Sequence, residues 1–319
     1  MPDSSEQPTI TFLDANTIGE VPNDDLLREL GNYRTYPNTE AAEVVDRLRG
    51  STVAITNKVK IGRAEMDQLP DLKLICVAAT GMNNIDLEAA EILGITVKNV
   101  AGYSTESVAQ LTLTSLFTLA MDLIHLNDAV YDGTYSKSEN FSYWRQPFYE
   151  LGGARFGIIG MGTIGRRVAR LAEAYGAEVV YYSTSGKNTD QNYPSLSLNE
   201  LLTTCEVVSI HAPLNEATNN LLTYQELSSM KKSAYLLNMG RGGIVNEADL
   251  ARAIDEEMIA GAAVDVFTRE PLPEDHPYLR VHRRNRLLLT PHVGWASVEA
   301  RMTLVAGVAK NIRTFLEKS

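Results

Sequence analysis

Arg241, Glu270 and His292 are the residues of this sequence best suited to proton transfer on a small anion. Each follows an apolar, strand-like run in the second half of the chain. Arginine presents a planar fork of donors that grips a carboxylate in two places and can polarise a neighbouring carbonyl oxygen. An imidazole exchanges a proton near neutral pH, and a carboxylate beside it favours its charged form. Because the carboxyl ends of neighbouring parallel strands line one crevice, we expect the three side chains to meet around a ligand.

Each of the three residues also has a simpler interpretation. Arg241 stands among glycines, which lets the backbone approach a ligand and favours a binding role; the alternative is a surface ion pair. His292 taken alone would be structural, and Glu270 could be an ordinary loop residue before a proline. The hypothesis of a proton-transfer site depends on finding all three residues at strand ends.

A glycine-rich stretch, Gly160–Gly165, directly follows the strand pattern Phe156–Ile159 and opens a helical run. Its sequence Gly-Met-Gly-Thr-Ile-Gly has the GxGxxG spacing of a dinucleotide-binding turn. The glycines permit a tight turn and close approach, and the amino end of the helix faces the pyrophosphate. The stretch therefore predicts a dinucleotide site, and the alternative is a turn that merely needs glycine.

The stretch expected to contact the ribose departs from the usual pattern. An NAD site usually presents Asp or Glu about twenty residues after the glycines. Here Ser183 stands where the acid is expected, followed by Thr184 and then by Lys187. Because hydroxyls and a lysine replace the acid, repulsion of a 2′-phosphate is absent and attraction is possible, so the choice between NAD(H) and NADP(H) stays open.

Two more strand ends carry polar residues near the expected dinucleotide. Asp265 follows an apolar run and could either accept a hydrogen bond from a nicotinamide amide or cap the following turn, and spacing favours neither role. His211 follows another apolar run and precedes Ala212 and Pro213. We interpret His211 as structural rather than catalytic.

An earlier strand-like run leads into Ala79-Thr80-Gly81-Met82. Successive backbone N–H groups in such a turn can form a nest that binds an anion, and a substrate carboxylate would fit there. The alternative is a simple strand-to-helix turn, with Asp86 at the start of the next helix.

Strand-like and helix-like runs alternate through residues 9–100 and again through 155–290. This alternation predicts two parallel sheets with helices on both faces. A long helical pattern over 105–130 lies between the two series and is expected to bridge two domains. Residues 133–153 are rich in aromatic side chains without a clear period, which fits either an interface arm or packing on their own domain.

Composition excludes several classes of protein. The 319 residues suffice for two domains, and 44% hydrophobic with 22% charged residues is typical of a globular chain. A net charge of −11 argues against nucleic acid as a partner. Cys76 and Cys205 lie in apolar runs without metal-ligand spacing, so we expect buried thiols in a reducing compartment and no metal site.

No secretory or membrane-spanning segment is expected. The first seven residues are polar and lack a basic segment followed by an apolar one. The most apolar long segment, 108–124, is interrupted by polar side chains, so it predicts a buried helix rather than a membrane span. We therefore expect a cytoplasmic protein that does not bind membranes.

Taken together, these stretches resemble the D-isomer-specific 2-hydroxyacid dehydrogenase family, in family order and over essentially the whole chain. The motifs that carry the resemblance are Ala79-Thr80-Gly81, Gly160-Met161-Gly162-Thr163-Ile164-Gly165, His211-Ala212-Pro213-Leu214, Asn238-Met239-Gly240-Arg241-Gly242, Asp265-Val266-Phe267 with Glu270-Pro271, and Pro291-His292-Val293-Gly294. The resemblance implies an α/β fold with two doubly wound parallel-sheet domains. A Rossmann NAD(P)-binding domain, 103–292, would be inserted into a flavodoxin-like substrate domain, 1–102 and 293–319, and two copies would form a homodimer.

The resemblance also implies roles for individual residues. Arg241 would bind and polarise a 2-oxo acid, His292 would act as acid and base, and Glu270 would tune His292. The implied substrate contacts are Ala79, Thr80, Gly81 and Met82. The implied contacts to NAD(H) or NADP(H) are Thr105, Gly160, Gly162, Thr163, Ile164, Gly165, Ser183, Thr184, His211, Ala212, Pro213, Met239, Gly240 and Asp265.

Within the family, residues 102–110 and 143–147 look similar to glycerate dehydrogenases, also called hydroxypyruvate reductases. The expected reaction is hydride transfer to hydroxypyruvate or glyoxylate, giving D-glycerate or glycolate. Two alternatives are an NAD(H)-sensing module that binds a protein, and a phosphoglycerate dehydrogenase. The intact catalytic set disfavours sensing alone, and the lack of an added basic cluster near Thr80 disfavours a phosphate-bearing substrate.

Overall fold

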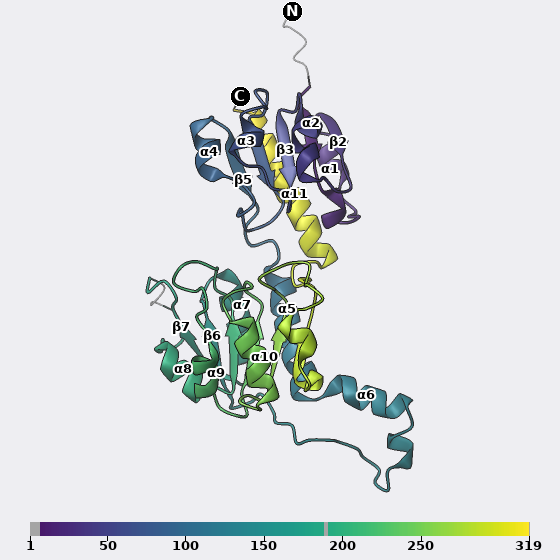
Figure 1. Ribbon diagram of the computed structural model, residues 1–319, viewed down its shortest axis with the longest axis vertical. Coiled ribbons are helices and arrows are strands. Elements are labelled where there is room, and N and C mark those ends of the chain that lie inside the picture. The colour runs from purple at the N-terminus through teal and green to yellow at the C-terminus, as the bar shows by residue number, and fades with distance from the viewer. Residues whose placement is uncertain (1–6, 188–190, 319) are drawn as a thin grey trace, which may run out of the picture. The chain divides into compact units, whose positions relative to one another are not determined.

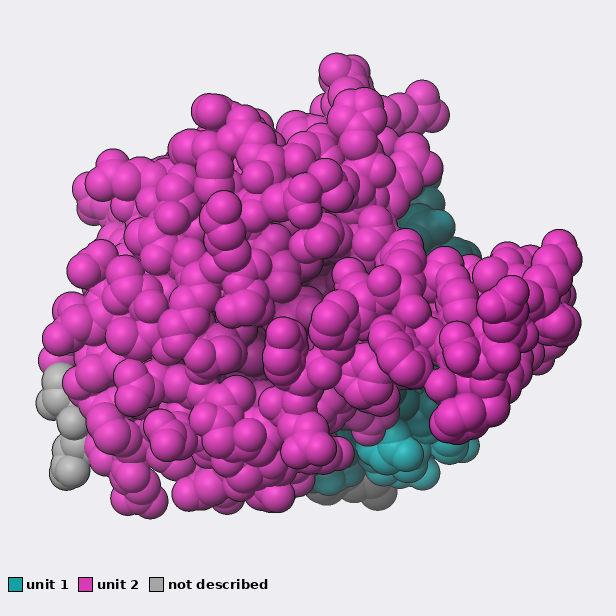
Figure 2. All heavy atoms as spheres, turned by 90° about the horizontal axis from the view of Figure 1, so that it is seen from below, with its two compact units in different colours: residues 1–104, 295–319 teal, residues 105–294 magenta. Residues whose placement is uncertain are grey.

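The computed structural model describes residues 7–187 and 191–318, and Figure 1 traces the chain. The chain divides into two compact units, shown in separate colours in Figure 2. Unit 1 comprises Met1–Ser104 and Trp295–Ser319, and unit 2 comprises Thr105–Gly294. The boundaries expected from the motifs, 102/103 and 292/293, lie two residues before these junctions.

Unit 1 is built on a five-stranded parallel sheet in the order β2-β1-β3-β4-β5, which is the flavodoxin-like order. Its strands are β1 (Thr9–Phe12), β2 (Asn32–Thr35), β3 (Val53–Thr56), β4 (Leu74–Val77) and β5 (Thr96–Asn99). Its α-helices are α1 (Asp25–Arg28), α2 (Val44–Leu48), α3 (Arg63–Met66), α4 (Leu87–Ile92) and α11 (Val298–Leu316).

Alternate residues of the unit 1 strands enter two different cores, because successive side chains of a strand point to opposite faces. Val53 and Ile55 of β3 pack with residues of α1 and α11, whereas Ala54 packs with residues of α2, α3 and α4. The final helix, yellow in Figure 1, therefore packs on the sheet formed by the first hundred residues, as expected.

Unit 2 contains a six-stranded parallel sheet in the order β11-β10-β9-β8-β6-β7. Its strands are β6 (Arg155–Ile159), β7 (Glu178–Tyr182), β8 (Val207–Ile210), β9 (Tyr235–Asn238), β10 (Gly261–Val264) and β11 (Leu287–Leu289). A single parallel bridge joins Tyr181 of β7 to Ser195. With Ser195 counted as the third strand position, the sheet follows the Rossmann order 3-2-1-4-5-6 and adds β11 at its edge. The predicted fold class is confirmed.

Helices cover both faces of the unit 2 sheet. They are α5 (Thr105–Ala120), α6 (Leu123–Tyr131), α7 (Thr163–Ala174), α8 (Leu198–Thr204), α9 (Tyr224–Ser229) and α10 (Glu247–Asp255). Phe156 and Ile158 of β6 enter the core that contains α5 and α7, whereas Ile159 enters the core of α8, α9 and α10. Gly157, also in β6, leaves room for α8, since a Cβ at this position would lie 2.7 Å from side-chain atoms of Leu201.

The single long helix expected over 105–130 is wrong. The structure has two helices, α5 and α6, bent by 59°. Asp122 between them has a left-handed backbone with φ +55°, and its carboxylate accepts a hydrogen bond from Arg145 (2.6 Å). Among the described residues no single helix is long and apolar enough to cross a membrane, and only this bent pair meets the length and composition criteria together. The apolar side of α5 is buried in the core of unit 2.

Residues 121–150 form an arm that leaves the body of unit 2 after α5 (Figure 1). Polar contacts within the arm include the Asp122–Arg145 pair and a 3.3 Å hydrogen bond between His125 Nε2 and the Tyr143 hydroxyl. Large side chains on the arm remain exposed, among them Phe141 at 93%, Tyr131 at 86%, Tyr149 at 81% and Trp144 at 62%. Packing of these aromatics on their own domain, one of the two alternatives, is therefore wrong.

Both cysteines are free and fully buried. Burial raises the pKa of Cys76 to about 12 and that of Cys205 to about 11, because the thiolate loses its hydration. Both side chains therefore behave as small apolar core residues rather than as nucleophiles.

Candidate active site

The carboxyl ends of the unit 2 strands bring four loops into close contact. A Cβ on Gly160, after β6, would lie 2.8 Å from the Ala212 backbone after β8. A Cβ on Gly240, after β9, would lie 3.0 Å from the Ala212 carbonyl oxygen, and one on Gly242 would lie 2.0 Å from the Phe267 carbonyl carbon. Only glycine allows these approaches, so the glycines of the sequence motifs pack neighbouring loops against one another.

His292 and Glu270 form a hydrogen-bonded pair at this edge. His292 Nδ1 lies 2.7 Å from Glu270 Oε2, and the side chains are 24% and 30% exposed. The other carboxylate oxygen of Glu270 accepts a hydrogen bond from the Phe267 backbone N–H (2.9 Å). Glu270 therefore fixes the ring orientation of His292, and the ring's second nitrogen, Nε2, has no partner among the described residues.

Asp265 ties the loop that carries His292 to the end of β10. Asp265 is 3% exposed and accepts hydrogen bonds from Thr290 Oγ1 (2.6 Å), the Val293 N–H (2.9 Å) and the Gly294 N–H (2.9 Å). His292 between these anchors has a left-handed backbone with φ +53°, a conformation that an L-residue keeps only when its surroundings impose it. Spacing along the chain did not suggest this role for Asp265.

Arg241 is a half-buried cation without an acidic partner. Its guanidinium donates a hydrogen bond to the Gly240 carbonyl oxygen (2.9 Å), and within residues 7–187 and 191–318 no carboxylate forms an ion pair with it. Buried Asn238 closes the loop, because its amide donates to the Arg241 carbonyl oxygen and its carbonyl accepts from the Gly240 N–H. The surface ion pair considered as an alternative is therefore absent, and an anionic ligand would complement this charge.

The residues expected to hold a dinucleotide fit that group. Gly160 has φ +94°, and a Cβ on Gly165 would lie 2.2 Å from the Gly160 carbonyl oxygen, so the start of α7 packs tightly on the turn. A Cβ on Gly162, by contrast, would meet nothing within 4 Å. Packed glycines thus build the turn, and an open glycine leaves space at the amino end of α7, where a pyrophosphate is favoured.

Two buried polar atoms near this turn lack partners among the described residues, Ser183 Oγ and His211 Nδ1. Ser183 directly follows β7, and His211 follows β8 with its Nε2 hydrogen-bonded to Ser209 Oγ (2.8 Å). Although part of the His211 residue is accessible, its buried ring is desolvated, which lowers the pKa of His211 to about 3. A neutral imidazole and an unpaired hydroxyl offer hydrogen bonds to a cofactor without adding charge.

The other expected cofactor residues lie at the same strand ends or at the starts of helices. Thr163 begins α7, Ile164 packs on the core beside it, and Thr105 begins α5. Met239 follows β9 and is buried, Pro213 follows Ala212 in the loop after β8, and Thr184 follows Ser183 after β7.

The loop Ala79–Met82 lies in unit 1, after β4. The Thr80 hydroxyl donates to the Val100 carbonyl oxygen (3.3 Å), and the Asn99 amide donates to the Thr80 carbonyl oxygen (2.6 Å). No hydrogen bond in the described part of the chain uses the backbone N–H of Thr80, Gly81 or Met82. Asp86 caps α4 through the Ala89 N–H, as the alternative proposed, so the turn has both a structural role and free donors.

The structure contains a second histidine–glutamate pair that the sequence analysis missed. His276 Nε2 lies 2.9 Å from Glu247 Oε2, and the other Glu247 oxygen accepts a hydrogen bond from the Thr268 N–H (2.7 Å). The only sequence signal was an acid in the first turn of a predicted helix, which is too common to indicate such a pair.

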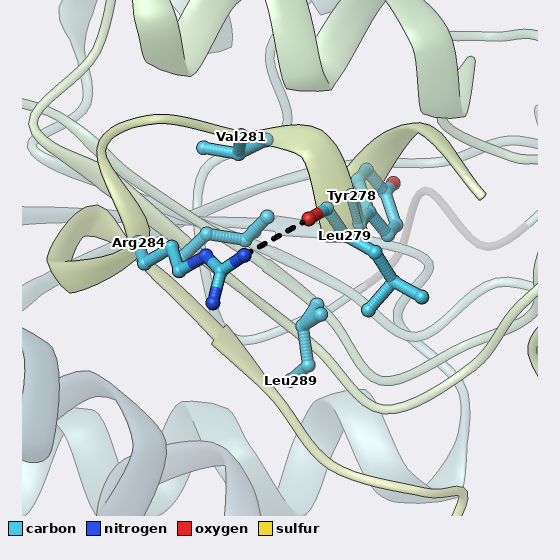
Figure 3. A pocket seen from close by; sticks show the side chains of 6 residues that line it. Tyr278, Leu279, Val281, Arg284 and Leu289 are labelled. Atoms are coloured by element: carbon cyan, nitrogen blue, oxygen red, sulfur yellow. Dashed lines mark hydrogen bonds between the residues drawn. The ribbon is translucent and has the colours of Figure 1, made fainter. Parts of the chain in front are cut away.

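An apolar hollow lies beside β11 and contains none of the expected site residues. It is lined by Tyr278, Leu279, Val281, Arg284, Leu287 and Leu289. Arg284 spans the hollow and donates to the Leu279 carbonyl oxygen at 3.3 Å (Figure 3). Among the described residues no group of three or more His, Cys, Asp or Glu side chains could hold a metal ion.

Comparisons with known proteins agree with these features. Residues 113–294 match the family model of the D-isomer specific 2-hydroxyacid dehydrogenase NAD binding domain. The glycerate dehydrogenase of Methylorubrum extorquens is 36% identical over 311 residues, which cover 96% of each chain. The hydroxypyruvate reductase of Blautia hydrogenotrophica is 31% identical over 299 residues, which cover 92% of each chain.

A solved structure extends the similarity to three dimensions. The NADPH-dependent glyoxylate/hydroxypyruvate reductase of Sinorhizobium meliloti, crystallised with NADP and malonate, has a TM-score of 0.82 and 25% identity. The alignment covers 98% of this chain and 94% of that chain. The chain therefore belongs to the D-isomer specific 2-hydroxyacid dehydrogenase family and is an NAD(P)-dependent oxidoreductase.

Proposed function

We propose that this protein reduces a small 2-oxo acid, hydroxypyruvate or glyoxylate, to D-glycerate or glycolate. The observation that carries the proposal is that Arg241, which forms no ion pair with any described carboxylate, follows a strand of the same sheet as Glu270 and His292. A cation and a proton donor at the carboxyl ends of one sheet suit a substrate with a carboxylate and a neighbouring carbonyl. The names of the similar proteins, glycerate dehydrogenase and hydroxypyruvate reductase, supply the substrates.

Residues of unit 2 hold the cofactor in this proposal. The turn Gly160–Gly165 and the amino end of α7 bind the pyrophosphate, and Ser183 with Thr184 contacts the adenosine ribose. The loops at His211 and Met239 line the same edge. When bound, the reduced nicotinamide supplies a hydride to the carbonyl carbon of the substrate.

His292 supplies the proton. Its Nδ1 is hydrogen-bonded to Glu270, so the ring remains oriented with Nε2 available to the substrate oxygen. The imidazolium donates its Nε2 proton to the developing alkoxide, and the His292 ring becomes neutral. The hydrogen bond to Glu270 keeps the remaining ring proton on Nδ1. Oxidation runs the same transfer backwards, with neutral His292 as the base.

Arg241 orients the substrate, because its guanidinium binds the carboxylate and polarises the carbonyl. In unit 1, the backbone N–H groups of Thr80, Gly81 and Met82, which have no hydrogen-bond partner among the described residues, form a nest suited to an anion such as a substrate carboxylate. On this basis unit 1 serves as the substrate domain and unit 2 as the NAD(P)-binding domain.

A cofactor-oxidation assay tests the proposal. The near-ultraviolet absorbance of NADH and of NADPH is followed with hydroxypyruvate, glyoxylate, pyruvate and 3-phosphohydroxypyruvate. We expect turnover with the first two substrates at higher kcat/KM than with the others. Turnover that is best with 3-phosphohydroxypyruvate would assign a phosphoglycerate dehydrogenase, and no turnover with any substrate would favour the sensing module.

The same assay decides the cofactor. Ser183 stands at the end of β7 in place of an acid, and its hydroxyl is buried without a partner. Introducing Ser183→Asp places a negative charge where a 2′-phosphate would lie, so we expect kcat/KM with NADPH to fall far more than with NADH. Equal losses with both cofactors would show that Ser183 does not face the ribose.

The arm provides a surface for a second copy of the chain, and we propose a homodimer. Exposed Phe141, Trp144 and Tyr149 form the kind of aromatic surface that becomes buried in protein interfaces. Sedimentation analysis should give a dimer for the intact chain and a monomer for the triple serine variant of these residues. A cytoplasmic location, to which the free buried cysteines are suited, and the absence of nucleic-acid and membrane partners stay predictions.

A further inference from the structure

Two glutamates bind two successive backbone N–H groups at the turn after β10. The Phe267 N–H donates to Glu270 (2.9 Å), which orients His292, and the Thr268 N–H donates to Glu247 (2.7 Å), the first residue of α10. The backbone of Phe267 is therefore held at both ends, because its own N–H binds Glu270 and the N–H of the peptide that follows it binds Glu247. A displacement of the Phe267 backbone would move the contact that fixes Glu270.

Glu247 is itself held by His276. Glu247 Oε2 lies 2.9 Å from His276 Nε2, and the two side chains are only 15% and 6% exposed. The Tyr278 N–H donates to His276 Nδ1 (3.2 Å), so the ring proton must reside on Nε2 and be donated to Glu247. The ring lies between aromatic neighbours, with its centroid 4.8 Å from that of Tyr278 and 6.1 Å from that of Phe267.

The surroundings of the pair leave little freedom. Burial raises the pKa of Tyr278 well above its usual value, with the nearby Glu247 charge adding to the effect, so the Tyr278 hydroxyl stays neutral. Gly242 also packs so closely on this turn that a Cβ would lie 2.0 Å from the Phe267 carbonyl carbon. The turn is thus in contact both with the loop that carries Arg241 and with Glu247.

We propose that Glu247 and His276 are positioning residues for catalysis: they hold the Phe267–Thr268 peptide in place, and through Glu270 they set the orientation and protonation of His292. This inference rests on the proposed role of His292 and Glu270. Neither Glu247 nor His276 touches the substrate or the reacting atoms in this scheme. Their effect reaches His292 through the backbone of Phe267 and the carboxylate of Glu270.

Glu247→Gln is the most informative substitution. Glu247 accepts one donor on each oxygen, from Thr268 and from His276, whereas glutamine has a single acceptor and presents an NH₂ group on the other side. Whichever way the amide is turned, its NH₂ faces one of the two donors. The substitution therefore preserves size and removes one of the two hydrogen bonds, leaving a buried donor unsatisfied.

The expected result is a change in turnover and in its pH dependence. Glu247→Gln should lower kcat by on the order of 10- to 100-fold, because a small displacement of a catalytic group is sufficient for such a loss. The high-pH midpoint of the kcat/KM profile for reduction should move to lower pH by at least about 0.5 unit, since a misaligned Glu270 stabilises the imidazolium less. The KM for the nicotinamide cofactor should not change.

A matched control lies on the same helical turn. Asp249, also in the first turn of α10, accepts a hydrogen bond from the Tyr224 N–H (3.0 Å) and does not bind the turn at 267–268. Asp249→Asn should reduce the melting temperature comparably and leave the pH midpoint unchanged. His276→Phe is a second variant that keeps the Thr268 bond, and it should shift the midpoint in the same direction by less.

Glu270→Gln serves as the reference that separates the two proposals. If Glu270→Gln moves the midpoint and Glu247→Gln does not, the inference about Glu247 is overturned and the His292–Glu270 role stands. If Glu270→Gln also leaves the midpoint unchanged, both proposals fail. A midpoint that moves equally in Asp249→Asn would show a general loss of structure and would overturn the inference.

Discussion

Unit 2 contains two histidine–glutamate pairs with similar geometry and different surroundings. The His292–Glu270 pair is 2.7 Å apart and its side chains are 24% and 30% exposed, whereas the His276–Glu247 pair is 2.9 Å apart with side chains 6% and 15% exposed. In the buried pair both ring nitrogens have partners. In the accessible pair Nε2 has none among the described residues, so only His292 can exchange a proton with a ligand.

The difference shows that residue type alone does not mark a catalytic histidine. Both rings are held by a carboxylate, and burial with a second hydrogen bond turns one of them into a fixed part of the scaffold. Glu270 of the accessible pair follows β10, the neighbour of the strand β9 that leads to Arg241, and His292 follows the next strand, β11. Arg241 forms no ion pair with a carboxylate among the described residues. Substitutions at His292, Arg241, Gly165 and His211 test this contrast.

Replacing the two histidines should have very unequal consequences. His292→Asn should lower kcat by about 10³-fold, because it removes the proton donor, while the KM for NAD(P)H stays near the wild-type value. His276→Phe should retain most of the turnover. Steady-state reduction of hydroxypyruvate or glyoxylate measures both variants, and a larger loss in His276→Phe would reverse the assignment of the two pairs.

Arg241 should matter almost as much as His292. Arg241→Ala should cost about 3 kcal/mol of transition-state stabilisation in kcat/KM, because the carboxylate and the carbonyl lose their charged donor. Arg241→Lys should recover only part of this loss, since a lysine cannot present the bidentate fork. Arg252, which pairs with Glu256 on the exposed face of α10, provides the control, and Arg252→Ala should leave kcat/KM unchanged.

The turn Gly160–Gly165 contains one glycine that is closely packed, Gly165, and one that is open, Gly162. A Cβ at position 165 would lie 2.2 Å from the Gly160 carbonyl oxygen, so Gly165→Ala should reduce the free energy of unfolding by about 2 kcal/mol. A Cβ at position 162 meets nothing, so Gly162→Ala should leave the stability unchanged and weaken NAD(P)H binding. Thermal unfolding and calorimetric titration separate the two effects. A destabilised Gly162→Ala would contradict the open turn.

His211 differs from both pairs because its ring is hydrogen-bonded to a hydroxyl, Ser209 Oγ, and to no carboxylate among the described residues. Burial lowers the pKa of His211 from the usual 6.5 to about 3. Below pH 6.5 His211 therefore binds a proton in the unfolded chain but stays neutral in the folded protein. Stability should therefore fall as the pH drops from 7 to 5. For this group the loss is at most about 2 kcal/mol, and His211→Asn should remove it. Urea unfolding without cofactor at the two pH values checks the difference, and identical losses in both proteins would show that His211 titrates normally.

Much of the fold was predictable from local patterns. Strand β6 (Arg155–Ile159) stands where the pattern Phe156–Ile159 predicted it, and strands alternate with helices through 9–100 and 155–290, because period and turn residues are local properties of the chain. The break between α5 and α6 was not predictable in this way, because the apolar pattern continues through Asp122. The break depends on a left-handed residue and on Arg145, which is distant in sequence.

The candidate site shows the same division. Motif order along the chain was sufficient to select Arg241, Glu270 and His292, since each follows a strand of one parallel sheet. The partners of Asp265 could not be predicted, because Thr290, Val293 and Gly294 reach it only through the neighbouring strand β11. The same holds for Glu247 and His276, which meet across 29 residues of chain.

The sequence by itself determined the family, the two parallel sheets and the residue types at the strand ends, since these depend on period, glycine spacing and chain order. The tertiary structure decided which histidine is accessible, which carboxylates bind backbone N–H groups and that Arg241 forms no ion pair with a described carboxylate. Burial and hydrogen-bond pairing arise between segments remote in sequence, and the chemistry of an ionisable side chain depends on both.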